Sequence, residues 1–320
     1  MAEDLGLDEV RAHALTNIGF ARAGRADAEG IDDLEHSLAI ALARNSPESV
    51  RTYLNLGTVL ADFGDLRRTF AVHAEGRRAA ERFGDKAGME WFAAERLWEL
   101  YWRGGWDEAV ATSNALLIDA EAGSPRSHSE PGARLVRSWI ALARGQLDTA
   151  LEDATRLRDF AREAKDLQSM FPALALRARI LASAGRYEEA RADAAELLRI
   201  WQQSEVSIGS YWTADLAFAV SQLGRDQDLL APLMTAPPTP WVAAARAVAT
   251  WEFEQAAALY AEIGSLPDEA LARLCAARRL RAAGRRPKAD AELERALAFH
   301  RRVRAERYVQ EGKALLAAAG

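Results

Sequence analysis

Glycines that interrupt helical patterns recur about every forty residues along this chain, and this period limits what it can fold into. The interruptions fall at Gly24, Gly64, Gly104, Gly145, Gly185, Gly224 and Gly284, with Trp251 in the corresponding place between the last two. Glycine can leave a helix through a left-handed backbone at no steric cost. An internal period of this length is typical of a repeat array in which each unit packs on its neighbours.

Apolar stripes with helical spacing flank each glycine. Leu181 and Ala182 end one stripe before Gly185, and Ala190 and Trp201 lie on the next. The alanine five residues after the glycine leaves room for two helices to approach closely. It recurs as Ala109, Ala150, Ala190, Ala256 and Ala289, with Thr69 and Leu229 in weaker copies. The pattern predicts an all-α, right-handed superhelical solenoid of about eight helical hairpins plus a C-terminal capping helix.

The repeat also predicts the domain organisation. We expect one solenoid over residues 1–320, with a polar surface loop at 123–132 and a proline-rich break at 235–240. The closing helix is expected over 304–318, where it would cap the stack.

Composition favours a soluble, cytoplasmic protein. Cys275 is the only cysteine among 320 residues, so no disulfide framework or thiolate metal cluster is expected. The start MAEDLGLDEV is acidic and lacks the apolar core of a signal peptide. No apolar run approaches the ~20 residues that span a bilayer, so we expect no membrane contact.

Charge is spread unevenly along the chain. The net charge is −6, but residues 273–307 contain twelve Lys and Arg against four acidic residues. Such a run is most often a solvated helix face. The alternative is a docking surface for an acidic partner or for nucleic acid.

Motifs for catalysis and for cofactors are missing from the sequence. There is no GxxxxGK[ST] phosphate loop, no GxGxxG after a strand and no HExxH. The five histidines, His13, His36, His73, His128 and His300, have no metal-ligand spacing. We therefore expect no enzyme activity, no cofactor and no metal.

An aromatic line is the one constellation that suggests a site. Trp91, Trp98 and Trp102 fall within about 20° of one line on the helix expected at 86–103. Ala93 and Leu97 face the other way, so both faces are apolar. The tryptophans either pack in the core or line a concave groove.

In the groove interpretation, other first helices of hairpins contribute at equivalent positions. These residues are Trp139 and Arg179, with Arg51 and Tyr211 one turn nearer the N-termini of their helices. Tryptophan and arginine are the usual anchors of a bound partner. The candidate site therefore comprises Trp91, Trp98, Trp102, Trp139, Arg179, Arg51 and Tyr211.

Two turns resemble the tetratricopeptide turn: GRYEEA at 185–190 and GQLDTA at 145–150. A wider likeness covers 34–66, 80–110, 259–303 and 306–320, for example GSLPDEALARLCAARRLRAAGRRPKADAELERAL. These stretches resemble the tetratricopeptide-like C-terminal solenoid of bacterial, especially actinobacterial, signalling proteins. Such proteins place a class III adenylate/guanylate cyclase domain and an AAA-type ATPase ahead of this tail. Related tails occur in large ATP-binding LuxR-type regulators.

The resemblance implies a non-catalytic interaction or effector-sensing module in signal transduction. Its partners would be a protein or peptide, or a small effector in the concave groove, with ATPase or cyclase domains upstream in cis or in trans. The catalytic parts of those proteins have no match here. The alternative is a nucleic-acid-associated regulator that binds through the basic C-terminal face, although the acidic net charge argues against it.

Overall fold

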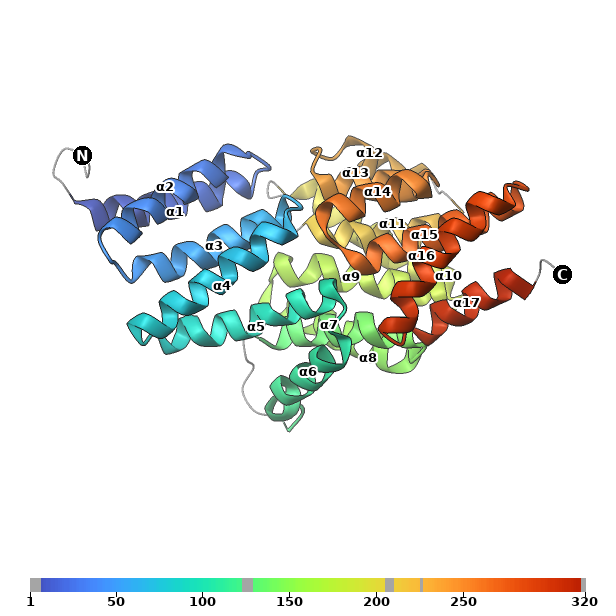
Figure 1. The fold of residues 1–320 in the computed structure, drawn as a ribbon, viewed down its shortest axis with the longest axis horizontal. Coiled ribbons are helices and arrows are strands. Elements are labelled where there is room, and N and C mark those ends of the chain that lie inside the picture. Colours follow the sequence, from blue (N-terminus) through green and yellow to red (C-terminus); the bar gives the residue numbers. More distant parts are fainter. Residues whose placement is uncertain (1–6, 123–128, 205–209, 225–226, 318–320) are drawn as a thin grey trace. The chain divides into compact units, whose positions relative to one another are not determined.

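The computed structural model describes residues 7–122, 129–204, 210–224 and 227–317, and within these ranges it contains helices and no strand (Figure 1). This confirms the prediction of an all-α protein. The α-helices are α1 (Asp8–Ala23), α2 (Glu29–Ala43), α3 (Glu48–Asp62), α4 (Leu66–Phe83), α5 (Lys86–Arg103), α6 (Trp106–Glu121), α7 (Glu130–Arg144), α8 (Leu147–Ala164), α9 (Leu167–Ser183), α10 (Tyr187–Gln203), α11 (Thr213–Gln222), α12 (Gln227–Thr235), α13 (Pro240–Ala249), α14 (Phe253–Ile263), α15 (Leu266–Ala282), α16 (Arg286–Arg302) and α17 (Glu306–Ala317). A short 3-10 helix, η1 (Ser210–Trp212), precedes α11.

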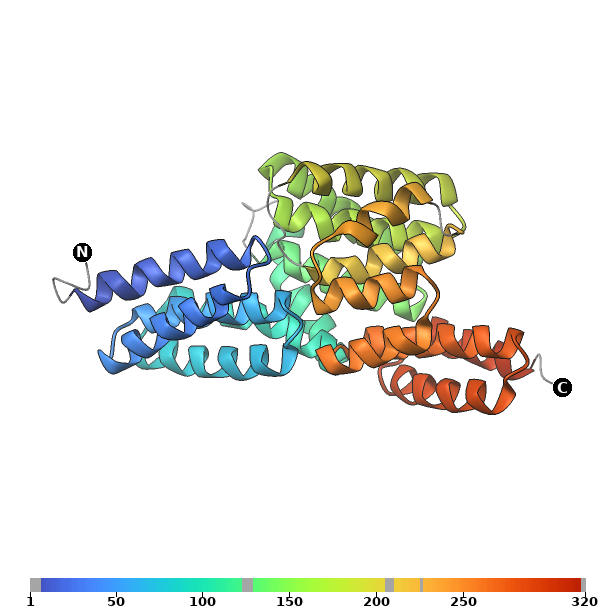
Figure 2. The ribbon, with the colours of Figure 1, turned by 90° about the horizontal axis from the view of Figure 1, so that it is seen from above.

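The chain divides into two compact units. Unit 1 comprises Met1–Arg96 and Ser204–Ser210, and unit 2 comprises Leu97–Gln203 and Tyr211–Gly320. Within each unit, consecutive helices pack as hairpins, as α1 does on α2 and α9 on α10 (Figure 2). The predicted right-handed superhelix and the single array over the whole chain remain predictions.

A left-handed residue ends the first helix of most hairpins. At Gly64 φ is +76°, and the next N–H, that of Asp65, bonds to the carbonyl oxygen of Leu60 at 2.9 Å. This bond satisfies a carbonyl that the end of the helix would otherwise leave open. The same left-handed backbone occurs at Gly104, Gly145, Gly185, Gly224 and Gly284. The glycine period in the sequence is therefore a period of helix C-termini.

Two hairpins form this turn with a residue other than glycine. Gly24 keeps a right-handed backbone (φ −60°), and Ala26 is left-handed in its place. Trp251, between α13 and α14, has a φ of +67°. A left-handed backbone costs a residue with a side chain roughly 1–2 kcal/mol.

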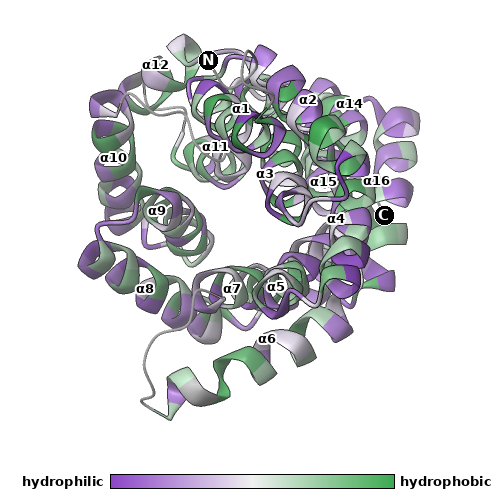
Figure 3. Cartoon of the chain, turned by 90° about the vertical axis from the view of Figure 1, so that its left-hand side faces the viewer, coloured by the Kyte–Doolittle hydropathy of each residue, from purple (hydrophilic) through white to green (hydrophobic). Residues whose placement is uncertain are grey.

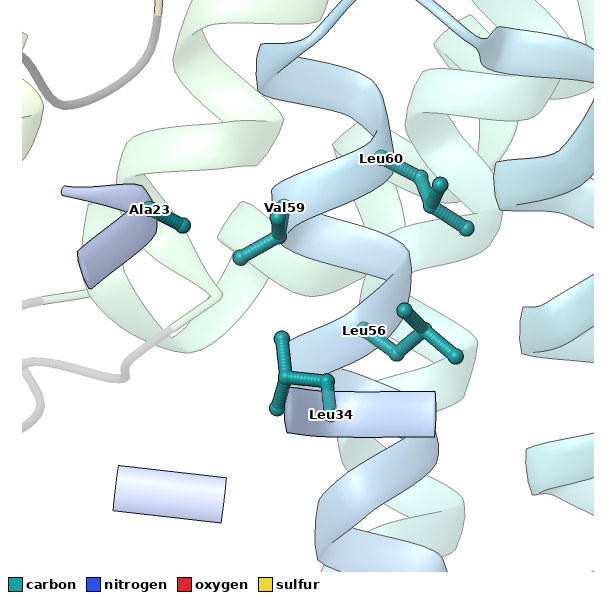
Figure 4. Close-up of a cluster of buried hydrophobic side chains, with 5 residues drawn as sticks. All are labelled: Ala23, Leu34, Leu56, Val59 and Leu60. Atoms are coloured by element: carbon teal, nitrogen blue, oxygen red, sulfur yellow. The ribbon is translucent and has the colours of Figure 1, made fainter. Parts of the chain in front are cut away.

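The core of unit 1 lies between α1, α2 and α3. Ala23, Leu34, Leu56, Val59 and Leu60 form one buried cluster (Figure 4). Apolar side chains at i, i+3 and i+4, as on α3, bring one stripe of a helix onto its neighbours.

Small residues set the helix spacing in unit 1. A Cβ added at Gly30 would lie 2.4 Å from the carbonyl oxygen of Gly19, so α1 and α2 touch backbone to backbone. A Cβ added at Gly57 would lie 2.0 Å from His73 Nε2, so the missing side chain on α3 leaves the space that the His73 imidazole of α4 fills. At these two positions glycine is needed because a side chain would collide with the neighbouring helix, and not because the backbone adopts an unusual conformation.

Three hydroxyls connect the first three helices inside this core. Thr16 Oγ1 lies 2.7 Å from Ser37 Oγ and 3.0 Å from Thr52 Oγ1, and all three residues are buried. The Ser37 hydroxyl also donates to the carbonyl oxygen of Ala12. Because each hydroxyl has a partner, burial leaves no polar group of the trio unsatisfied.

The last helices of unit 2 contact its first hairpins. The Phe299 ring of α16 lies 5.8 Å from the Trp106 ring of α6, and α17 packs against α7 (Figure 1). An Arg307 guanidinium N–H donates to the carbonyl oxygen of Ser183 at the end of α9. The C-terminal helices α16 and α17 therefore close unit 2 by packing against its first hairpins.

Outer helices carry a polar face and an apolar face. Hydrophilic and hydrophobic colours alternate along α8 and α10 in Figure 3. The buried residues of α10 include Ala190, Ala194 and Leu197. The alanines expected at close helix contacts, Ala109, Ala150, Ala190, Ala256 and Ala289, are buried. None of the described helices is long and apolar enough to cross a membrane.

The two breaks expected within the array have different outcomes. Residues 123–128 of the expected loop 123–132 lie outside the described residues, and α7 already begins at Glu130. Between Thr235 and Pro240 the chain leaves one helix and enters the next, as expected for the break at 235–240.

Gly30→Ala should destabilise the protein by about 1–3 kcal/mol, because the added methyl meets the backbone of α1, which cannot move as a side chain can. The measurement is the free energy of unfolding in denaturant. Asp32→Ala, at an exposed position on the same helix, is the control and should cost less than about 1 kcal/mol. Equal losses in the two variants would contradict the close contact.

Candidate functional site

The seven candidate residues divide between the two units. Arg51 and Trp91 belong to unit 1, whereas the other five belong to unit 2. In unit 2 the structure brings the five together, although they come from hairpins far apart in the sequence.

Stacked and edge-on aromatic rings form the centre of this cluster. Trp98 lies 5.6 Å from Trp102, 5.8 Å from Trp139 and 5.3 Å from Tyr211, measured between ring centroids. Trp102 also lies 6.0 Å from Trp241 of α13. Edge-to-face and offset pairs at these distances add about 0.5–1.5 kcal/mol each beyond the area they bury.

A buried carboxylate joins Trp139 to Arg179. Asp215 of α11 accepts a hydrogen bond from Trp139 Nε1 at 2.6 Å and from the Arg179 guanidinium through its other oxygen. Arg179 also donates to the Tyr308 hydroxyl of α17 at 2.9 Å. Arg179 is 6 % exposed and Asp215 is 2 % exposed, so the ion pair is removed from water.

Electrostatics keep this buried arginine charged. Burial alone would lower the pKa of Arg179, but the Tyr308 oxygen and the Asp215 carboxylate outweigh it and raise that pKa above its usual range. Burial also raises the pKa of Tyr101, which stacks on Trp139 at 4.5 Å. The inner side of unit 2 is thus a dry region with one compensated ion pair.

Burial decides which candidates a partner can reach. Trp102, Trp139 and Arg179 are buried, and their contacts are with other residues of unit 2. Trp98 and Tyr211 are half-buried and form the accessible edge of the cluster. For the three buried residues, the core interpretation of the aromatic line fits the structure; the binding role of the set remains a prediction.

The two candidates in unit 1 lie on α3 and α5. Arg51 pairs with Glu48 at 2.9 Å and donates to Asn17 Oδ1 of α1, so it ties two helices together. Trp91 is 45 % exposed.

Sequence reasoning missed Asp215, Trp241 and Tyr308. Asp215 had a visible signal, because it is the one charged residue in the otherwise apolar run TADLAFAV. Buried acidic residues are almost always paired. Trp241 and Tyr308 gave no such signal, since their role depends on how the ends of unit 2 meet.

Helix α1 presents a second surface. Leu7, Val10, Ala14, Ile18 and Ala21 are exposed and fall within about 80° of one another around the helix. The opposite side of α1 packs on α2 and α3. An apolar stripe on the outer face of a helix is typical of an interaction surface.

Helix α16 presents a third surface, which is basic. Within α16 and at its N-cap, all of them described residues, six exposed cations have no carboxylate within 4.0 Å. They are Arg285, Arg286, Lys288, Arg295, Arg301 and Arg302. Other cations of the run are paired, such as Arg273 with Glu292 and Arg278 with Glu311.

The described histidines and the cysteine show no arrangement typical of a metal site. The described residues contain no group of three or more His, Cys, Asp or Glu side chains that could hold a metal ion. Burial lowers the pKa of His73 and of His300 to about 4, so both imidazoles are neutral near pH 7. Burial raises the pKa of the Cys275 thiol to about 11, which keeps it protonated and unreactive.

No protein-family model matches the chain, and a search of curated proteins gives no significant match. The expected kinship with cyclase–ATPase tails therefore remains a prediction.

Asp215→Asn should destabilise the protein by about 3–5 kcal/mol, because it leaves the Arg179 charge buried without compensation. The measurement is the denaturant midpoint of unfolding. Glu189→Gln removes one partner of the exposed Arg186–Glu189 pair and should leave the midpoint nearly unchanged. A small effect of Asp215→Asn would show that the ion pair does not hold unit 2 together.

Asp268→Asn should change how stability depends on pH. Burial raises the pKa of Asp268 from 3.8 to about 6, despite a hydrogen bond from Ser265, so the folded state holds its proton more tightly than the unfolded state. Wild-type stability therefore loses this contribution as pH rises from 4 to 6, while the low pKa of His300 acts in the opposite direction.

The Asp268→Asn variant has no carboxyl group to ionise at this position, so it does not lose stability for this reason as pH rises. Its free energy of unfolding should rise relative to wild type between pH 4 and 7, as measured by denaturant titrations at each pH. A difference that stays constant over this range would contradict the buried, protonated carboxyl group.

Proposed function

We propose that the chain is a non-catalytic protein-interaction module, the regulatory region of a bacterial signalling protein of the cyclase–ATPase type. The observation that carries the proposal is the exposed apolar stripe on α1. Val10 is 55 % exposed and Ile18 is 51 % exposed, yet both lie on a well-formed helix whose other side is core. Side chains of this kind gain stability when another surface covers them.

The partner that fits this stripe is a helical surface. The outer face of α1 is apolar along its length, so a partner helix can pack along it as one hairpin packs on the next. In the resembling signalling proteins, an ATPase or cyclase domain in cis or in trans would be that partner, and binding would be relayed to it.

The half-buried edge of the aromatic cluster supports a second contact for the same function. Trp98 and Tyr211 offer ring faces for an apolar side chain of a peptide or for a small effector. A ligand bound at this edge would change the packing of Trp102 and Trp139, because their rings pack directly on Trp98.

A nucleic-acid-associated regulator is the second candidate. The observation in its favour is the set of unpaired cations on α16, including Arg295 and Arg301. Binding of duplex DNA that weakens about 10³-fold or more between 50 and 200 mM salt would support it.

Photo-crosslinking from α1 tests the main proposal. A benzophenone amino acid in place of Ile18 should yield one discrete crosslinked product in the host cell. Mass spectrometry of that product should identify a chain with a nucleotide-binding motif. Val10→Glu combined with the crosslinker should abolish the product, because a charge in the middle of the contact must lose its hydration.

The control carries the same crosslinker at Arg67, an exposed position on α4. It should give no product of that mass. Equal products from both positions, or none from Ile18, would contradict a docking role for α1. Purified protein should also leave ATP and GTP unchanged, and turnover above background would contradict the non-catalytic assignment.

A further inference from the structure

A hollow of about 380 Å³ lies in unit 2 beside the turn between α13 and α14. Its floor consists of the buried side chains of Ala276 and Leu280 of α15. Trp251, Arg279 and Arg285 form its wall and rim. The volume lies within the range of sites that hold a small molecule or one large side chain.

Trp251 occupies a turn position that glycine fills in most other hairpins. Its φ of +67° is the conformation that favours glycine, and 37 % of its surface is exposed. A bulky aromatic residue in a left-handed backbone is a strained choice. Strain of this kind gathers at binding sites, where the side chain contributes something that glycine cannot.

Charge around the hollow favours an anion. The Arg279 guanidinium lies 5.6 Å from the centre of the Trp251 ring, a cation–π distance, and Arg285 is exposed at the rim. Neither arginine has a carboxylate within 4.0 Å among the described residues. Arg286 and Lys288 extend the positive surface along α16.

We propose that this hollow binds an acidic peptide segment of a partner protein. One large apolar side chain of the peptide packs against the Trp251 ring and the floor of α15. Carboxylates on either side of it pair with Arg279 and Arg285, whose guanidinium groups suit bidentate contacts.

A peptide fits this hollow better than a nucleic acid does. Glu252 and Glu254 also lie at the rim, where their charges favour the N-terminus of α14. They would repel the continuous charge of a phosphate backbone. A peptide carries its carboxylates only where its sequence places them, so it can meet the arginines and avoid the glutamates.

The site does not depend on the α1 stripe, which belongs to the other unit. Failure of the α1 crosslink would therefore leave this proposal intact, and failure of the peptide would leave the α1 proposal intact.

The probe is a fluorescein-labelled peptide with phenylalanine between two pairs of glutamates, blocked at both ends. Fluorescence anisotropy with the full chain should show saturable binding with a Kd on the order of 10–100 μM. A peptide with lysines in place of the glutamates should bind at least about tenfold more weakly, because Arg279 and Arg285 would repel it.

Two variants of the hollow have matched controls. Trp251→Gly should fold, with a Tm within about 3 °C of wild type, because it gains the turn residue of the other hairpins while losing the packing of the ring. It should weaken peptide binding at least about fivefold. Tyr187→Ala, at an exposed aromatic residue of α10 outside the hollow, should leave binding within about twofold.

Arg285→Ala should likewise weaken binding, whereas Arg199→Ala, at an exposed arginine of α10, should not. Three outcomes would overturn the proposal. They are no saturable binding of the glutamate peptide, equal binding by wild type and Trp251→Gly, or oligothymidylate that binds more tightly than the peptide and is lost in the same variants.

Discussion

One hydrogen bond repeats at most of the described turns between helices, although not between α12 and α13. The N–H after the left-handed residue reaches the carbonyl oxygen five residues earlier, from Arg186 to Leu181 at 2.9 Å and from Arg285 to Leu280 at 2.8 Å. The bond closes each helix end without a side-chain cap and fixes the direction of the next helix. Because the geometry is the same at each turn, successive hairpins enter with similar orientations, and neighbouring helices can meet through alanine and glycine.

A repeated ion pair adds a second period to this frame. Arg137 of α7 pairs with Asp153 of α8, and forty residues later Arg177 of α9 pairs with Asp193 of α10. Each pair joins the two helices of its own hairpin.

Arg179 departs from this rule, since its carboxylate comes from the next hairpin and its hydroxyl partner from α17. An ion pair within one hairpin forms wherever that hairpin lies. The Arg179 network, in contrast, requires three hairpins and the C-terminal helix to be in place together. This makes it the contact on which the closure of unit 2 depends.

Local structure was largely predictable from the sequence, and contacts between distant hairpins were not. The helix expected at 86–103 agrees with α5, and the helix expected at 304–318 contains α17, because stripes and turn residues are local signals. The start of α7 at Glu130 was missed, since GSPRSHSEPG is polar and a proline in the first turn of a helix resembles a loop in sequence.

The candidate site, too, could be predicted from the sequence only in its local features. Trp98, Trp102 and Trp139 do gather, as their shared helix faces predicted. Trp241 and Asp215 meet these tryptophans through contacts between hairpins that are not consecutive in the chain. No local period in the sequence encodes such contacts. The burial of three of the five candidates in unit 2 follows from those contacts and not from their own helices.

Closure of unit 2 also affects where a partner can bind. Each buried tryptophan removes roughly 150–250 Å² from water, which is worth roughly 4–6 kcal/mol at the usual area coefficient. A ligand that entered between Trp102 and Trp241 would have to separate several such rings and expose the Arg179–Asp215 pair. No single peptide contact returns the free energy of several such rings together, since an interface hot spot contributes about 2–8 kcal/mol. Binding that keeps unit 2 folded must therefore use surfaces that are already open, such as the edge at Trp98 and Tyr211 and the turn at Trp251.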